Sequence, residues 1–501
     1  MKRILIVVLA IIIFATTASY GQITGYDGGI KDDYIYKEVI FITGEPIVVE
    51  GTVETKERQK SDVITTTQTF ELSNDSEEVE LKRKITYETN LYIKEDIGQT
   101  VAVTSISKSS EEISVGSDEY ELEDYQFSHS TIYDNRPAVD FYSGNLSGKK
   151  TYSINGDEGT VIVETSGDTM VGYEHYWGTS ETFILTQDIH REETTVYEDV
   201  YGDEYNVEWD GMTTLKISSM TKKDFSYVRN DPTNISFRGG LLQTEKEENV
   251  LQYEYDLPKF DDDGIPYEKK RNRDEENLRM DTVPIHKRLV IPSLKDISGH
   301  WAEEGIFTLY SLEVFDDPSE YFGPKLPMTR AEFAKSIVRA ISTLEEEEEA
   351  EKIKRLRNRN AEDEEVVFDD IDREDDEFEY VKFVKENGIM NGISESFFAP
   401  DAVLTRAQAI TILVRTLGLE DMAPNPPYRT HYDDDDEIPF WAKDTIYAAS
   451  EIGLINGDTY GNVNPNESMN KAEAATMIYR FINHIKDEIT VDYREKIINS
   501  Y

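Results

Sequence analysis

The chain has 501 residues, no cysteine, and 101 acidic against 52 basic residues, which gives a formal net charge of -49. This length predicts about three folding units, at roughly 100–200 residues each. The absence of cysteine excludes disulfides, thiolate catalysis, Cys-ligated metals and a lipoprotein anchor. The acidic excess argues against a nucleic-acid partner, because phosphate binding needs a basic face.

The N-terminus has the pattern of a secretory signal peptide. Lys2 and Arg3 precede an uninterrupted apolar run from Ile4 to Phe14, and small residues follow up to Gly21. The run is well short of the ~20 residues that a membrane-spanning helix needs. We therefore expect a signal peptide over 1–21, a secreted protein, and no contact with the membrane once the signal is removed.

The region 22–258 is rich in Thr, Tyr, Val and Ile and contains short alternating runs. KEVIFI (37–42), KITYETNLYI (84–93) and GTVIVET (159–165) are typical of strands. Turn signals occur among these runs, namely Asn74-Asp75, Asn155-Gly156-Asp157, Ser166-Gly167-Asp168 and Asp210-Gly211. We expect an all-β, sandwich-like extracellular region of one or two modules, at roughly 110 residues per module.

The segment 259–290 is dense in charge and poor in apolar residues, so we expect a charged linker. Its acidic start, Asp261-Asp262-Asp263-Gly264, lacks the alternating ligands and the closing Glu of an EF-hand calcium loop. The sequence therefore predicts no metal site here, and no other motif indicates a metal or a cofactor.

Beyond residue 290 the pattern becomes helical and repeats three times. The segments 323–341, 399–417 and 464–482 align without gaps. In each segment a proline precedes a basic residue by six positions and an arginine follows that residue by nine; the sets are Pro324, Arg330 and Arg339, then Pro400, Arg406 and Arg415, then Pro465, Lys471 and Arg480. Because such a unit cannot bury its apolar face alone, we expect the copies to pack together.

Each repeat also has an upstream helix, clearest where Ala442, Ile446, Ala449 and Gly453 fall on one helical face. We assign helix-loop-helix repeats to 291–343, 366–420 and 430–486. Between the first two, the charged insert 344–365 is expected to be an exposed helix.

These residues resemble the S-layer homology (SLH) domain family. The resemblance rests on LKDISGHWA (294–302), on a proline before the second helix, and on TRAE (329–332) at its start. It covers about 200 of the 501 residues. It implies an all-α, pseudo-threefold bundle that binds pyruvylated secondary cell-wall polysaccharide and anchors the protein non-covalently in the cell wall, with other surface-layer proteins as further partners.

The second helices begin with capping boxes, because Thr329 with Glu332, Thr405 with Gln408, and Asn470 with Glu473 can satisfy backbone donors reciprocally. The basic residue at the first helical position opposes the helix dipole, so we interpret it as a ligand for an anion at the helix N-terminus. The alternative is that this basic residue makes an ordinary ion pair at the protein surface. The expected polymer-binding residues are Arg330, Arg406, Lys471, Trp301, Trp441, Asn391, Gly392, Asn456 and Gly457. Trp301 and Trp441 could stack on sugar faces, but an aromatic residue that opens an amphipathic helix is more often part of the core.

The sequence leaves an alternative function for the displayed region and an alternative mode of attachment to the wall. SLH anchors also carry polysaccharide hydrolases, but the acidic residues are too plentiful to single out a catalytic pair, and the sequence has no HExxH, GxSxG or Walker motif. Sortase attachment at Leu326-Pro327-Met328-Thr329 fails because no Gly follows. We expect no catalytic residues and no enzyme activity.

Overall fold

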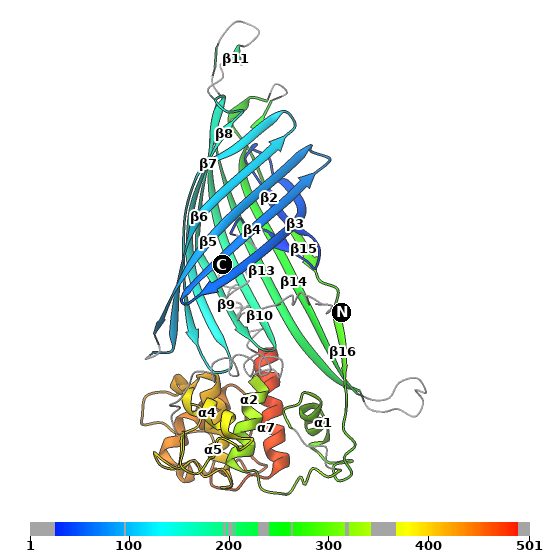
Figure 1. Cartoon of the computed structure of the whole chain (residues 1–501), viewed down its shortest axis with the longest axis vertical. Helices are drawn as coiled ribbons and strands as arrows, with labels where there is room; N and C mark the ends of the chain where they lie inside the picture. The colour runs from blue at the N-terminus through cyan, green and yellow to red at the C-terminus, as the bar shows by residue number, and fades with distance from the viewer. Residues whose placement is uncertain are drawn as a thin grey trace, which may run out of the picture.

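The computed structural model describes residues 26–94, 97–193, 197–198, 204–205, 207–228, 240–261, 264–315, 320–341 and 367–488. The expected signal peptide (1–21) and charged insert (344–365) lie outside the described residues. A tall antiparallel sheet forms the N-terminal region, and the helices of the C-terminal region lie against one end of it (Figure 1).

The strands follow one another along the sheet in nearly sequential order. They are β1 (Ile30–Lys31), β2 (Tyr36–Ile40), β3 (Ile47–Lys60), β4 (Val63–Asn74), β5 (Val79–Lys94), β6 (Gln99–Val115), β7 (Asp118–Asn135), β8 (Asp140–Ile154), β9 (Gly159–His175), β10 (Gly178–Glu193), β13 (Glu208–Val228), β14 (Gly240–Phe260), β15 (Pro266–Asp281) and β16 (Ile285–Leu289), with a separate small pair of β11 (Tyr197–Glu198) and β12 (Glu204–Tyr205).

Alternation of buried and exposed residues explains why these segments form strands. In β5, Val79, Leu81 and Ile85 are buried while Glu80 and Lys82 between them are exposed, as the two faces of a strand require. Two of the expected turns are confirmed: Asn74-Asp75 lies between β4 and β5, and Asn155 and Gly156, both with positive φ, lie between β8 and β9.

The other two expected turns are wrong, because both lie inside strands. Ser166-Gly167-Asp168 is in β9, where the register with β8 and β10 shifts, as a β-bulge does. Asp210-Gly211 is in β13, where a Cβ on Gly211 would come within 2.7 Å of the Leu257 side chain. In both places glycine permits an irregular or close-packed strand and marks no chain reversal.

The expected sandwich modules are replaced by a single sheet. Among the described residues, 14 strands join in one antiparallel sheet, and the sheet curls so that its beginning meets its end. The Asn249 side chain donates to the carbonyl of Lys31 at 2.6 Å, and the Val283 N–H donates to the Asp33 carboxylate at 3.2 Å. The buried apolar residues therefore face one interior and not the gap between two stacked sheets.

The linker expected over 259–290 is also wrong, since most of this segment forms β15 and β16 on β14. Its charges are tolerated because β15 is an exposed edge strand, whose backbone is paired by β14. Arg271 and Arg273 both pair with Asp256 of β14, at 2.5 and 2.8 Å. Composition alone resembles that of a disordered segment, but pairing with a neighbouring strand supplies the missing stabilisation.

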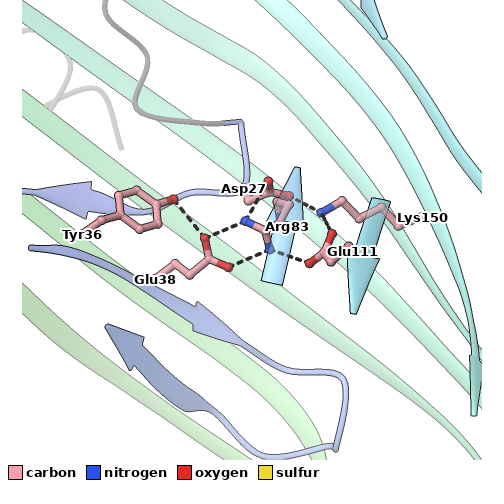
Figure 2. A network of polar contacts seen from close by, with 6 residues as sticks. All are labelled: Asp27, Tyr36, Glu38, Arg83, Glu111 and Lys150. Carbon is pink, nitrogen blue, oxygen red and sulfur yellow. Dashed lines mark hydrogen bonds and ion pairs between the residues drawn. The ribbon is translucent and has the colours of Figure 1, made fainter. Parts of the chain in front are cut away.

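The interior of the curled sheet contains a cluster of buried charges (Figure 2). We call it the Arg83 cluster; it comprises Asp27, Tyr36, Glu38, Arg83, Glu111 and Lys150. Arg83 donates to Glu38 at 2.8 and 2.9 Å and to Glu111 at 2.6 Å. Lys150 donates to Glu111 at 2.8 Å and to Asp27 at 2.6 Å. The cluster joins the chain before β1 to strands β2, β5, β6 and β8.

The helices of the C-terminal region are α1 (Glu303–Ser311), α2 (Arg330–Ile341), α4 (Phe378–Glu386), α5 (Arg406–Leu417), α6 (Lys443–Glu451) and α7 (Lys471–Asn483), with short turns of helix η2 (Glu420–Met422), η3 (Asp435–Glu437), η4 (Phe440–Ala442) and η5 (His484–Glu488). Each expected repeat thus contributes two main helices: α1 and α2, α4 and α5, then α6 and α7.

The two regions share a packed junction. Trp177, in the turn between β9 and β10, is buried and donates from Nε1 to the carbonyl of Ala340 in α2 at 3.2 Å. The Ala138 N–H donates to the carbonyl of Thr416 in α5 at 3.1 Å, and Lys486 pairs with Asp224 at 2.8 Å. One contact comes from each repeat, so the sheet and the repeats are docked on one another.

Candidate functional site

The repeats pack through helix contacts between successive copies. The second helix of each repeat packs on the first helix of the next: α2 on α4, α5 on α6, and α7 on α1. At the centre, backbone bonds run from Met328 N to Met469 O, from Leu404 N to Met328 O, and from Met469 N to Leu404 O, at 2.9, 3.0 and 2.9 Å. These residues are almost completely buried, so the three connections close a ring.

The start of each second helix is held by the loop of another copy. The N–H groups of Arg330 and Ala331 donate to Ala402 O and Pro400 O; those of Arg406 and Ala407 donate to Glu467 O and Pro465 O; those of Lys471 and Ala472 donate to Leu326 O and Pro324 O. The recurring proline therefore supplies an acceptor. Because these first donors are already bonded, the basic side chains, and not the helix N-termini, must supply any attraction for an anion.

A repeated aspartate, which the sequence analysis did not single out, holds each of these loops. Asp296 accepts from the N–H groups of Phe322 and Gly323, Asp370 from Phe398 and Ala399, and Asp434 from Val463 and Asn464, all at 2.7–2.9 Å. Although its burial acts in the opposite sense, these donors lower the pKa of Asp296. The second residue of each pair has a positive φ: 71° at Gly323, 60° at Ala399 and 53° at Asn464.

The expected capping boxes are confirmed in all three copies. Thr329 with Glu332, Thr405 with Gln408, and Asn470 with Glu473 exchange hydrogen bonds of 3.0–3.4 Å. These residues are thus accounted for by helix capping alone.

Arg330 is only 6% exposed, and its guanidinium reaches into the second repeat. It donates from Nε to Phe398 O at 2.9 Å and from Nη2 to Asn391 O at 2.7 Å, and lies over the Phe398 ring. Burial lowers the pKa of Arg330 and Asp370 opposes the change, but an arginine stays charged at neutral pH. The contacts position this cation beside the Asn391-Gly392 turn.

A hollow of about 290 Å³, which we call the Trp441 hollow, brings together four of the expected residues, one or more from each repeat. Its lining is Arg330, Ile389, Met390, Asn391, Gly392, Gln408, Thr411, Ile412, Arg415 and Trp441. The lining includes two guanidinium groups and no carboxylate, and the indole of Trp441 is 53% exposed. A Cβ on Gly392 would lie 2.4 Å from Ser394 O, so this turn requires glycine.

A second hollow, the Arg406 hollow, has about 250 Å³ and contains Arg406, Asn456 and Gly457. Arg406 donates from Nη2 to Asn456 O at 3.3 Å. The remaining lining includes Asp458, Glu467 and Glu473, and the donors on Asn462 and Asn464 hold the pKa of Asp458 below its ordinary value. Carboxylates therefore outnumber the cation in this hollow.

Lys471 and Trp301 differ from their counterparts. Lys471 pairs with Glu332 of the first repeat at 2.7 Å, which matches the ion-pair alternative considered above. Trp301 is 65% exposed but is absent from the lining of both hollows. The turn of the first repeat that corresponds to Asn391-Gly392 falls at 316–319, outside the described residues.

Arg339 donates to the hydroxyl of Tyr380 at 3.0 Å and so links α2 to α4. Within the described ranges, no three His, Asp or Glu side chains come together as metal ligands. None of the helices in the described part of the chain is long and apolar enough to cross a membrane.

Comparison with known proteins identifies the repeated region. The S-layer homology domain family matches residues 293–334, 367–410 and 431–475. The chain is 30% identical over 132 residues to an endoglucanase of Bacillus sp. (strain KSM-635), covering 26% of this chain and 13% of that protein. It is 27% identical over 219 residues to the surface-layer 125 kDa protein of Lysinibacillus sphaericus, covering 43% and 17%.

A third relative is the exoglucanase XynX of Acetivibrio thermocellus, 25% identical over 189 residues, which cover 37% of this chain and 16% of that protein. The chain spans less than a fifth of each of these three relatives. A surface layer protein of Brevibacillus choshinensis is 30% identical over 104 residues, which cover 21% of this chain and 9% of that protein. Together with the family match and the Lysinibacillus sphaericus protein, it supports anchoring at the cell surface. The C-terminal region carries three S-layer homology domains, and the protein is a secreted cell-surface protein of the cell wall.

Proposed function

We propose that the three SLH domains form a pseudo-threefold body that anchors the chain non-covalently to pyruvylated secondary cell-wall polysaccharide. The closed ring of backbone bonds at Met328, Leu404 and Met469 supports the pseudo-threefold arrangement. The curled sheet is then a non-catalytic region displayed outside the wall.

The observation that carries the proposal is the lining of the Trp441 hollow. Arg330 and Arg415 supply positive charge, Trp441 supplies an exposed aromatic face, and no carboxylate faces the hollow. An acidic sugar needs a cation for its carboxylate, preferably a guanidinium, and a flat apolar surface for its ring. The Trp441 hollow is therefore the principal site, and the Arg406 hollow, with its carboxylates, binds the polymer weakly.

The test is co-sedimentation of the full chain with purified cell-wall sacculi, before and after acid removal of the wall polymer. We expect pelleting that depends on the polymer, and a loss of affinity of about tenfold for Trp441→Ala and for Arg415→Gln. Trp301→Ala is the matched control, because it removes an indole that is at least as exposed from the corresponding position of the first repeat.

Pelleting that survives removal of the polymer would contradict the proposed ligand. Equal losses for Trp441→Ala and Trp301→Ala would contradict the assignment of the site while leaving the anchor in place.

The alternative is a wall-anchored polysaccharide-degrading enzyme, as the names of two relatives suggest for those proteins. Its catalytic carboxylates would lie in the sheet. One group of carboxylates there, in the Arg83 cluster, is bonded to Arg83 and Lys150 and surrounds a cavity of only about 40 Å³, which favours a structural role for this group. Release of reducing sugar from wall polysaccharide by the purified chain would reverse this preference.

A further inference from the structure

The outer strand β15 carries two blocks of like charge in its middle, with Glu268 before them and Arg279 and Asp281 after them. Lys269, Lys270, Arg271 and Arg273 occupy its first half, and Asp274, Glu275 and Glu276 follow directly. β15 ends the sheet order, and it pairs only with β14 among the described strands. The start of the sheet reaches the far end of β15, where Asn249, opposite Met280, donates to Lys31 O. Of the strands that the structure describes, β14 alone pairs with the charged half-strands, so their outer backbone edge is unpaired within this part of the chain.

The acidic block is not neutralised within the described part of the chain. Glu275 accepts from the neutral side chain of Gln252 and Glu276 from the hydroxyl of Tyr253. In the basic block, Asp256 pairs with both Arg271 and Arg273, so one carboxylate faces two guanidinium groups while Lys269 and Lys270 add further positive charge. The basic block therefore keeps a net positive charge and the acidic block a net negative charge.

We propose that this edge binds β15 of a second copy of the chain, antiparallel across a twofold axis. Antiparallel pairing of a strand with itself brings its first half opposite its second half, so the basic block of each copy meets the acidic block of the other. A strand edge with charges of one sign repels the same edge of a second copy. When the two halves of the strand carry opposite signs, the two copies attract each other, and the charge pairs set the register.

The register follows from symmetry. Because both copies show the same face of the sheet, residues directly opposite one another must be separated by an even number of positions in the sequence. Centring the axis on Arg273 places Lys270 opposite Glu276 and Arg271 opposite Glu275, each pair made twice, against a single Arg273–Arg273 contact on the axis itself. Centring it on Asn272 gives two favourable pairs, Lys270 with Asp274 and Lys269 with Glu275, but also two like-charge pairs, Arg271 with Arg273 and Glu268 with Glu276. Centring it on Asp274 leaves one favourable pair, so the balance of charges favours Arg273 on the axis.

One strand pair is a small interface, and we expect a dissociation constant in the micromolar range. Sedimentation equilibrium of the purified chain across that range measures it. Lys270→Glu and Glu276→Lys each replace attraction by repulsion at two symmetric positions, so each raises the dissociation constant about tenfold. The Lys270→Glu/Glu276→Lys double variant restores the opposite charges and returns the dissociation constant to within about threefold of the original.

A single engineered cysteine tests the register, because the protein has none of its own. Cα atoms directly opposite in an antiparallel pair lie about 4.5–5.5 Å apart, within the range that a disulfide spans. Mild oxidation of the Arg273→Cys variant therefore yields a covalent dimer. Lys60→Cys is the matched control, since Lys60 is exposed at the end of β3, whose outer half pairs on one side only.

A chain that stays monomeric across the micromolar range overturns the proposal. So does a Lys60→Glu variant that weakens association as much as Lys270→Glu, because association would then use the edge of β3. Cross-linking of Lys60→Cys that equals that of Arg273→Cys overturns the register and with it the twofold pairing.

Discussion

In the sheet, each strand pairs mainly with its neighbour in the sequence, whereas in the repeats each second helix packs on the first helix of the following copy. The two regions also place polar groups differently. The sheet buries several charges together in the Arg83 cluster, whereas the centre of the repeats is held by backbone bonds at Met328, Leu404 and Met469. Because neighbouring strands pair through their backbones, side chains in the interior of the sheet are available for ion pairs. Each repeat, in contrast, packs on the other two and depends on them for its stability.

Removing Arg83 should have the largest effect on the sheet. Arg83→Met leaves Asp27, Glu38 and Glu111 buried with Lys150 as their only cation, which should cost about 3–5 kcal/mol of the free energy of unfolding. Chemical denaturation measures it. Lys82→Met is the control, since Lys82 is the next residue on the exposed face; equal losses for both variants would contradict a special role for the cluster.

Trp177→Ala should separate the two regions. It removes a buried indole and its bond to Ala340 O, at a cost of about 3 kcal/mol. Calorimetry should then resolve two unfolding transitions where the unmodified chain has one. Trp209→Ala removes an indole from the sheet interior and should destabilise the sheet without splitting the transition; a single transition in both variants would argue that the junction does not couple the regions.

Acid should weaken the sheet, by less than the loss of Arg83. Despite its burial, the cations Arg83 and Lys150 lower the pKa of Glu111 to about 2. This carboxylate therefore stabilises the fold above the unfolded-state value of ~4.3, and its contribution is lost as the pH falls through about 2.

Glu38 acts in the opposite direction, because burial raises its pKa. Its contribution is present at low pH and is lost as the pH rises through the folded-state value, so it partly offsets Glu111 in acid. Denaturation of the unmodified chain at a series of pH values should show a loss of stability below about pH 4, and Glu111→Gln should abolish it. An unchanged pH profile would contradict the assignment to Glu111.

Asp370→Ala should destabilise the repeats by about 1–3 kcal/mol, because the N–H groups of Phe398 and Ala399 lose their acceptor. Thermal unfolding followed by far-UV circular dichroism measures the change. Asp369 is the adjacent exposed residue, and Asp369→Ala should leave the transition in place.

The smallest effect is expected at a capping box. Thr405→Ala removes the side-chain acceptor for Gln408 N, at a cost of about 1 kcal/mol. Thr405→Ser keeps the hydroxyl and should restore most of the loss in the same unfolding experiment; failure of serine to do so would point to packing of the threonine methyl group.

The repeats were predicted well because each carries its own local signals. A capping box, a helical apolar face and the offset from Pro324 to Arg330 recur in register, so the three copies support the same helix assignment. The aspartates were missed as a set because they act at a distance: Asp296, Asp370 and Asp434 lie 27, 29 and 30 residues before the backbone groups they hold. An aspartate 28, 30 and 31 positions before the recurring prolines Pro324, Pro400 and Pro465 was the available signal.

In the sheet, the strands and two turns were predictable, and the curl was not. An alternating pattern has the same period whether a strand belongs to a sandwich or to one continuous sheet. The glycines at 167 and 211 look like turns until neighbouring side chains are placed around them. The charge of β15 indicates disorder from composition alone, because the strand that stabilises it, β14, is not visible in that composition.

The docking of the sheet on the helices has a mechanical consequence. Ala340, Thr416 and Lys486 each belong to a different repeat, and each touches the same end of the sheet. Because the sheet is held at three separate points, a force on its far end is divided among three contacts. The contacts therefore oppose tilting of the sheet as well as its displacement. A tether of the same length would instead let the sheet swing freely and would transmit only tension to the wall.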